Sequence, residues 1–308
     1  MDTNILYNIP DFANSAMPLG WPIAIYFFLT GSLAGLYITS VIATLMKKEE
    51  WQPIAKIGAV GSVVLLMTAP VLLIIDLNQP VRFWHLFVYL NPSSPLSWGS
   101  FFLAADAVVC LGYAYFVLQG NTKMARAWGL GGLPIAIAGH GYTGFFLALS
   151  KARAFWNTAL NPALFMVSAM VSGLALLIVL SNLWLRRNAP EMSVLQVEKH
   201  KGVMGTLLRL FIIFIVADLF LIGSDLTVLA SSNPESYAML QLLTTGEFAF
   251  WFLGIELLLG AVLPLALLSF PKTRMIPAVQ YASAALVIIG IFVMRVIIVI
   301  GGQSVQLF

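Results

Sequence analysis

The segment VMGTLLRLFIIFIVADLFLIGSDLTVLA, residues 203–230, decides the fold class of this chain. A membrane has a hydrocarbon core about 30 Å thick, and roughly 20 apolar residues in an α-helix cross it. The segment exceeds that length and carries only three charged side chains, Arg209, Asp218 and Asp225. It therefore predicts a membrane-spanning helix.

The same pattern recurs along the whole sequence. Seven more apolar segments of sufficient length lie near residues 20–46, 54–77, 97–119, 127–150, 162–185, 247–270 and 275–301. Together the eight segments predict an all-α membrane protein with eight transmembrane helices. No stretch between them is long enough for a soluble domain, so we expect a single membrane domain over residues 1–308. The longest connections, 78–96, 186–202 and 231–246, are expected to form caps or short surface helices.

The composition supports this class. Apolar residues make up 60% of the chain and charged residues only 9%, against about 25% charged in an average soluble domain. Too few charges are present to cover a water-exposed surface, so lipid must cover most of it. The formal net charge of +3 says little by itself. We expect membrane lipid as a partner, and no nucleic acid.

The basic residues of the predicted loops indicate an orientation, because cytoplasmic loops carry an excess of Lys and Arg. One side collects eleven: Lys47, Lys48, Lys56, Lys123, Arg126, Arg186, Arg187, Lys199, Lys201, Lys272 and Arg274. The other side has three: Arg82, Lys151 and Arg153. Both termini are then expected outside, on the periplasmic side of a bacterial inner membrane.

Several ionisable residues fall inside the predicted helices, where each costs about 2.5–3.5 kcal/mol to insert. They are Asp76, Asp106, Arg209, Asp218, Asp225, Glu256 and Arg295, with His140 and Tyr142 as polar neighbours. Asp218 and Asp225 are two helical turns apart and share a helix face. These charges could simply pair and lock helices together. Because so many lie in the outer half, a polar pocket that opens outward, together with a proton route, explains more.

The cysteine and histidines limit the redox groups that this chain can hold. The single cysteine, Cys110, excludes an intramolecular disulfide and cannot supply the four thiolates of an iron–sulfur cluster. Haem ligation by His85 and His140 is disfavoured because His85 falls in a predicted loop. We therefore expect no metal, haem or iron–sulfur cluster in this chain. His200 lies in a basic predicted loop, where we expect it to be solvated. Redox chemistry would need a bound small molecule or another subunit.

Four sets of residues, in order along the chain, carry a resemblance to a known family. They are Trp21-Pro22-Ile23-Ala24-Ile25-Tyr26 with Gly31 and Ala34-Gly35; Asn78-Gln79-Pro80 with Phe83-Trp84; Tyr142-Thr143-Gly144-Phe145 with Ser150 and Asn161-Pro162; and Arg295 with Gly301-Gly302-Gln303. This ordered set resembles the polysulfide reductase/NrfD family of membrane subunits. One departure is Gln79, where family members commonly carry Arg before the Pro, and Arg82 follows instead.

The resemblance implies two four-helix bundles and a quinone pocket, for menaquinone or ubiquinone, near the outer surface. By resemblance, Tyr142 is expected to reach a quinone oxygen, with Tyr26, Asp76 and His140 as further candidates. Asp218, Asp225, Glu256 and Arg295 are similar to a candidate proton route, to which we add Asp106. The implied partners are an extrinsic ferredoxin-like iron–sulfur subunit and a catalytic subunit, often a molybdopterin enzyme.

These expectations describe a non-catalytic membrane subunit of a quinone-linked respiratory oxidoreductase, and two alternatives remain. An ion-coupled secondary transporter could use the same buried charges, and such helices are commonly broken near mid-membrane. Pro70, Pro134 and Pro264 would mark such breaks. A purely structural anchor would bind partners without binding quinone.

Overall fold

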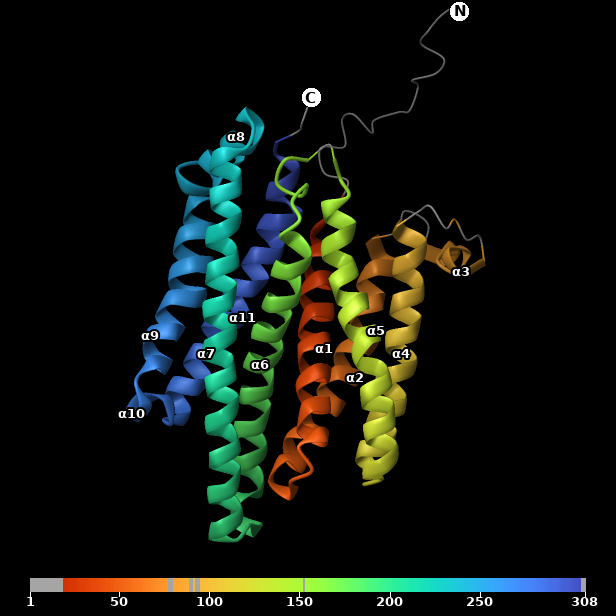
Figure 1. Ribbon diagram of the computed structural model, residues 1–308, viewed down its shortest axis with the longest axis vertical. Helices are drawn as coiled ribbons and strands as arrows, with labels where there is room; N and C mark the ends of the chain where they lie inside the picture. The colour runs from red at the N-terminus through yellow and green to blue at the C-terminus, as the bar shows by residue number, and fades with distance from the viewer. Residues whose placement is uncertain (1–18, 77–79, 89–90, 92–94, 152, 306–308) are drawn as a thin grey trace, which may run out of the picture.

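A computed structural model describes residues 19–76, 80–88, 91, 95–151 and 153–305, and its long helices lie alongside one another (Figure 1). The described residues form helices and connecting turns, without a β-strand. In chain order the elements are α1 (Trp21–Leu45), η2 (Glu49–Trp51), α2 (Gln52–Asp76), η3 (Pro80–Arg82), α3 (His85–Val88), α4 (Pro95–Leu118), α5 (Thr122–Ala148), α6 (Asn161–Asn188), η4 (Ala189–Glu191), α7 (Val194–Ser231), α8 (Pro234–Thr244), η5 (Phe250–Val262), α9 (Leu263–Ser269), α10 (Pro271–Arg274), α11 (Pro277–Val299) and η6 (Gly301–Gln303).

Seven helices in the described part of the chain are long and apolar enough to cross a membrane. The eighth predicted segment, 127–150, forms α5, a 27-residue helix. Its glycines and polar side chains make it less apolar than the other seven, so length and composition alone do not identify it as a span. The chain is thus a multi-pass membrane protein, and one of the eight predicted spans lacks this independent support.

The connection expected at 186–202 is mostly helical. Helix α6 continues to Asn188, and α7 begins at Val194, nine residues before the predicted start. Ser193 starts α7 with a capping box: its hydroxyl accepts a bond from Gln196 N (3.3 Å), and Gln196 Oε1 accepts one from Ser193 N (2.9 Å). Such a reciprocal cap satisfies two otherwise unpaired backbone donors. The predicted surface helices are present as α3 and α8.

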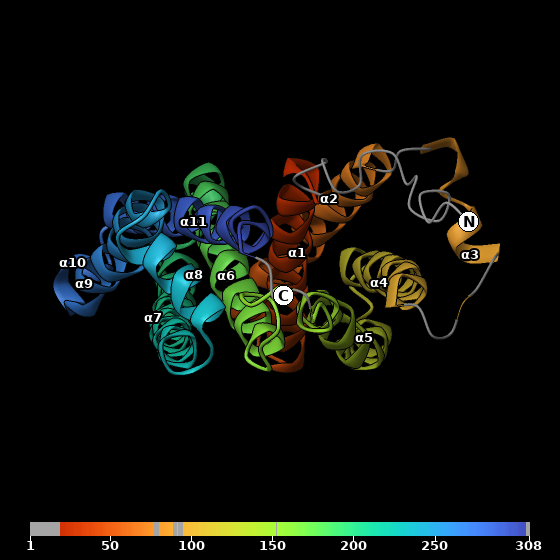
Figure 2. The same cartoon turned by 90° about the horizontal axis from the view of Figure 1, so that it is seen from above.

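Helix α1 lies at the centre of the molecule and packs against α2, α5, α6 and α11. Seen from above (Figure 2), α1 and α6 are in the middle, with α4 and α5 on one side and α7 and α9 on the other. Within these sides α4 contacts α2 and α5, while α11 contacts α6, η5 and α9. The α1–α6 contact therefore joins the two sides.

Two glycines allow α1 and α6 to approach closely. A Cβ added to Gly35 would collide with the carbonyl oxygen of Ala169, and one added to Gly173 would stand 2.5 Å from Gly35 Cα. No side chain larger than hydrogen fits there without moving a backbone. The Gly31–Gly35 spacing thus marks a packing surface of the kind common between membrane helices, as its sequence suggested.

The two ends of the molecule differ in charge. The α1–α2, α4–α5 and α6–α7 connections lie at the lower end in Figure 1, and most of the basic residues are in these connections or on the helix turns beside them. At the upper end the start and end of the described chain meet: Gln303 Oε1 accepts a bond from Leu19 N (3.2 Å), and Gln303 Nε2 donates to Leu19 O (2.9 Å). The predicted two-sided distribution of charge is therefore built into the fold.

Candidate functional site

A largely apolar cavity of about 260 Å³ lies between α1, α2, α4 and α5, near the end opposite the basic loops. Its lining contains three of the four residues expected to bind quinone, Tyr26, Asp76 and Tyr142. Aromatic side chains at Phe83 and Phe87, from the segment that precedes and forms α3, also reach it. The fold therefore brings together residues that are more than one hundred positions apart in the sequence.

Tyr142 enters the cavity from α5 because the facing helix leaves space for it. A Cβ on Gly99 of α4 would stand 2.6 Å from the Tyr142 ring and 2.9 Å from its hydroxyl. The ring also packs near Phe102 and Phe146, with centroids 5.7 and 6.3 Å away. Tyr142 is half-buried, so a phenol is held in a mostly apolar wall. Gly99 is the residue that permits this, and sequence inspection did not single it out.

Tyr26 and Asp76 line other parts of the same cavity. Tyr26 projects from α1, one turn after its start, and is half-buried. Asp76 is the last residue of α2, and its Oδ1 lies 3.4 Å from the position that a Cβ on Gly20 would take. Gly20 is the N-cap of α1 and has no side-chain cap. A carboxylate beside such a helix start is favoured, because the first backbone N–H groups lack partners.

His140 lies deeper in the molecule than the residues of this cavity. It is buried, and it lines a small cavity that shares Tyr26 and Tyr142 with the larger one and also contains Asp106. Its Nε2 donates to the Phe165 carbonyl at 3.0 Å, so a neutral ring has its lone pair on Nδ1. Nδ1 has no hydrogen-bond partner within the described residues. The neutral ring therefore presents Nδ1 as an acceptor that no described residue uses.

Arg295 occupies the core between the two sides of the molecule. It is 1% exposed, its Nη2 donates to Ser168 Oγ (2.5 Å) and approaches the Phe165 carbonyl (3.4 Å), and its guanidinium stacks 3.8 Å over the Phe165 ring. Asp218 and Glu256 are close enough to interact with its charge. These acids carry compensating negative charge, which a buried cation requires.

Four of the five predicted proton-route residues lie on the side of α7, η5 and α11. Asp218, Asp225, Glu256 and Arg295 are all buried, and Asp225 and Glu256 line one small cavity. Glu256 is within η5, a run of π-helix, a rare geometry that often marks functional sites. Asp106 lies apart from these four, beside His140 and against Gly139. The structure thus separates the predicted route into two clusters.

Other sequence expectations have different outcomes. His200 was expected to be solvated, but it is buried on α7, with Nε2 3.0 Å from Ser181 Oγ and its ring 5.2 Å from Trp184. The early start of α7 explains the error, since it converts the expected loop into a packed helix.

Asn78 and Gln79 lie outside the described residues. Among the residues that are described, no group of three or more His, Cys, Asp or Glu is arranged to hold a metal.

Comparison with known proteins matches nearly the whole chain to one family. The family described as "Polysulphide reductase, NrfD" matches residues 11–306. The chain belongs to this family. A polysulfide reductase chain from Wolinella succinogenes is 28% identical, over 92% of this chain and 94% of its own length. A selenate reductase subunit from Mesobacillus selenatarsenatis is 26% identical, over 90% of this chain and 72% of its own length.

A third relative in the NrfD family extends the range of complexes. The Hdr-like menaquinol oxidoreductase integral membrane subunit of Archaeoglobus fulgidus is 25% identical, over 90% of this chain and 68% of its own length. The relatives are thus membrane subunits of reductase and menaquinol oxidoreductase complexes. This supports a membrane-anchor role in a respiratory complex for the present NrfD-family chain, as its sequence predicted.

Proposed function

We propose that this chain is the quinone-binding membrane subunit of a respiratory oxidoreductase, and that it passes electrons between menaquinone or ubiquinone and an extrinsic iron–sulfur subunit. The carrying observation is the cavity lined by Tyr26, Asp76 and Tyr142. At about 260 Å³ it is close to the lower end of small-molecule sites, roughly 300–1,000 Å³. An apolar wall with a few polar groups suits a ring that bears carbonyl oxygens on a hydrocarbon tail.

The side chains of the cavity have different proposed roles, according to their chemistry. Bound quinol supplies two electrons and two protons on oxidation. Tyr142 and Tyr26 carry hydroxyls that can donate a hydrogen bond to a quinone oxygen. Asp76, at the rim, and His140, one layer deeper, can each hold a proton and pass it on. Phe83 and Phe87, both exposed, add aromatic surface to the cavity on the side of α3.

The second cluster is proposed as a proton route. Asp218, Glu256 and Arg295 lie together in the core, and Asp225 shares a small cavity with Glu256. One oxygen each of Asp218 and Asp225 has no hydrogen-bond partner among the described residues. Buried polar atoms are seldom left unpaired without water or another function. Water between these carboxylates would allow protons to move along this side of the molecule.

The proposal includes an arrangement in the membrane. We infer eight spans, with α5 as the eighth, in two four-helix groups: α1, α2, α4 and α5, then α6, α7, η5 with α9, and α11. Both chain ends face the periplasm across a bacterial inner membrane, because the basic loops collect at the opposite end. The ferredoxin-like subunit and a molybdopterin-dependent catalytic subunit would dock beside the cavity end. Anaerobic respiration is the expected context.

A Tyr142→Phe substitution tests the function, because it removes the hydroxyl and keeps the ring. In the intact complex we expect quinol-linked turnover to fall about tenfold or more, the scale of a lost positioning bond to the reacting group. Turnover with an artificial electron donor that enters at the catalytic subunit should not change. Tyr115→Phe, at an exposed position on α4, is the matched control. Full quinol-linked turnover in Tyr142→Phe would contradict the assignment.

The two alternatives gain no comparable support. Broken helices favour a transporter, but α2 and α5 continue through Pro70 and Pro134 without interruption. Pro264 lies where the π-helical run η5 passes into α9, and the span Phe250–Ser269 stays helical through it. A purely structural anchor predicts normal turnover in the Tyr142→Phe variant and no sensitivity to quinone analogues. The experiment above therefore also distinguishes the anchor from the quinone-binding subunit.

A further inference from the structure

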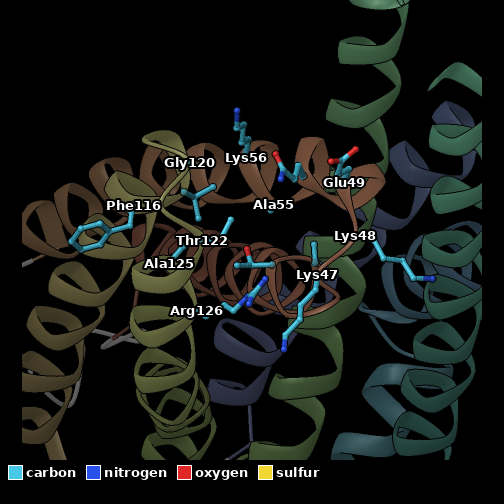
Figure 3. Close-up of a pocket in the computed structure, with 14 residues that line it drawn as sticks. Lys47, Lys48, Glu49, Ala55, Lys56, Phe116, Gly120, Thr122, Ala125 and Arg126 are labelled. Atoms are coloured by element: carbon cyan, nitrogen blue, oxygen red, sulfur yellow. The ribbon is translucent and has the colours of Figure 1, made fainter. Parts of the chain in front are cut away.

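A second, separate pocket lies at the basic end of the molecule, far from the cavity of Tyr142. It has a volume of about 160 Å³ and is formed where α1 turns into α2 and α4 turns into α5 (Figure 3). Four cations line it: Lys47, Lys48, Lys56 and Arg126. Glu49 is the only carboxylate in the lining. The lining therefore carries a surplus of positive charge.

Arg126 is the residue that distinguishes this pocket from an ordinary charged surface. Its side chain is half-buried on the first turns of α5, and its Nε is shielded from solvent. Within the described residues Nε has no hydrogen-bond partner. A buried donor without a partner is costly, so an external acceptor is expected to satisfy it. A guanidinium with Nε available presents the geometry that suits a phosphate or carboxylate.

The turns that frame the pocket have unusual backbones. Lys47 has φ 58° and Gly120 has φ 74°. Gly120 can adopt this left-handed conformation freely, whereas Lys47 has a Cβ that disfavours it. Among the described residues Lys47 alone combines a side chain with a positive φ. The α1–α2 turn thus holds two adjacent lysines at the pocket in a conformation that is unfavourable for the first of them.

The lysines can adapt to a ligand. In Figure 3 the side chains of Lys48 and Lys56 extend away from the pocket. Their flexible stems allow the ammonium groups to close on an anion. Apolar side chains are exposed at adjoining helix positions, at Met46 and Leu118. The pocket therefore offers cations for a head group next to apolar surface for acyl chains.

We propose that this pocket binds the phosphate group of an anionic glycerophospholipid at the membrane surface. Basic pockets between membrane helices on the cytoplasmic side are a known setting for such head groups. The inference uses the orientation proposed above, but it does not depend on quinone binding. It adds a lipid ligand on the opposite side of the membrane from the quinone cavity, which the comparisons with relatives do not indicate.

The test uses the full-length chain, delipidated in a neutral detergent, with three probes. Dioleoylphosphatidylglycerol is anionic, dioleoylphosphatidylcholine has no net charge, and inorganic phosphate lacks acyl chains. Native mass spectrometry counts retained lipid, and the thermal unfolding midpoint reports stabilisation. We expect phosphatidylglycerol to act at concentrations at least tenfold lower than phosphatidylcholine. Inorganic phosphate should have no effect below millimolar concentrations.

Arg126→Gln and Lys123→Gln form a matched pair, because both remove one charge from the start of α5. Lys123 is exposed and does not line the pocket. Arg126→Gln should abolish the preference for phosphatidylglycerol, and Lys123→Gln should keep it. Equal losses in both variants, or equal action of the two lipids, would overturn the proposal. If only inorganic phosphate acts and Arg126→Gln removes its effect, the phosphate site stands and its lipid source is wrong.

A second variant covers the case in which Arg126→Gln does not fold. Lys56→Gln removes another lining cation from an exposed position on α2, where a polar substitution is tolerated. The same loss of preference is expected, with a smaller change because the ammonium is mobile. An unchanged preference in Lys56→Gln, without a folded Arg126→Gln to compare, would count against the proposal.

Discussion

Phe165 on α6 connects two regions that the sequence keeps far apart. Its carbonyl accepts from His140 Nε2, and Arg295 lies against the same carbonyl and over the same ring. A proton on His140 would bring a second positive charge towards Arg295, which already faces Asp218 and Glu256. Like charges in a poorly hydrated interior repel strongly. A change of charge at His140 can therefore change the electrostatic energy of the second cluster without a helix movement.

The Ser168 hydroxyl accepts the shorter of the two hydrogen bonds that Arg295 Nη2 donates within the described residues. Ser168→Ala removes an acceptor from a buried charge, which costs about 1.5–3 kcal/mol of stability. Ser172→Ala, one turn further along α6, is the control, because among the described residues the Ser172 hydroxyl bonds to its own helix alone, at Ala169 O (3.2 Å). The midpoint of thermal unfolding in detergent should fall clearly more in Ser168→Ala. Equal midpoints would mean that this bond contributes nothing.

Asp76 provides the second prediction at the scale of single residues. Asp76→Asn keeps the size of the side chain and removes its negative charge and its ability to hold a proton. We expect kcat for quinol oxidation in the intact complex to fall tenfold or more, on the scale of a lost general base, with a smaller change in KM. Glu235→Gln, on α8 and outside the cavity, should behave as wild type. An unchanged kcat for Asp76→Asn would exclude a proton-handling role.

At the scale of elements, the α1–α6 contact sets the spacing of the two sides. Gly35→Ala would place a methyl group against the backbone of α6, and such overpacking costs about 1–3 kcal/mol. Gly205→Ala on α7 meets nothing within 4 Å, so the better helix propensity of Ala should leave that variant neutral or slightly more stable. The unfolding midpoints of the two variants should move in opposite directions or differ clearly. If both rise, the helices are not held by this contact.

Helix positions were predictable to different degrees, for physical reasons. Hydropathy measures how favourably a segment transfers from water into lipid. It therefore located the cores of the long helices but not their ends. The start of α7 at Val194 depends on the Ser193–Gln196 capping box, a local signal in the sequence that hydropathy does not register. The π-helical turns of η5 leave no trace in an apolar run. They depend on the neighbours against which that run packs.

At the scale of the whole molecule, it is easier to predict which ionisable residues are buried than which of them contact one another. Of the charges in long apolar segments, Asp218, Asp225, Glu256 and Arg295 are buried, whereas Arg209 is exposed. Which of them meet depends on helix packing, so the separation of Asp106 from the other four could not be read from their positions. Phe165 and Ser168 were missed for a related reason. They look like ordinary helix residues, and only their contacts with His140 and Arg295 give them significance.

The orientation of the molecule is the remaining prediction, and Cys110 makes it simple to test. Cys110 is the only cysteine and is buried, so Cys110→Ala provides a background without thiols. Into it we would introduce Glu191→Cys at the basic end and Ser232→Cys at the opposite end, both exposed positions between long helices. A membrane-impermeant maleimide should label Ser232→Cys in intact spheroplasts. It should label Glu191→Cys only after permeabilisation, because an excess of basic residues keeps loops in the cytoplasm.

The opposite labelling pattern would have a specific consequence. It would place the cavity of Tyr26, Asp76 and Tyr142 near the cytoplasmic surface, so the extrinsic subunits would dock inside the cell. It would also put the pocket of Arg126 in the periplasmic leaflet. Quinone binding depends on the cavity itself and would survive that result. The proton route proposed through Asp218, Asp225 and Glu256 would still run from mid-membrane towards the end that holds the chain termini, but that end would face the cytoplasm.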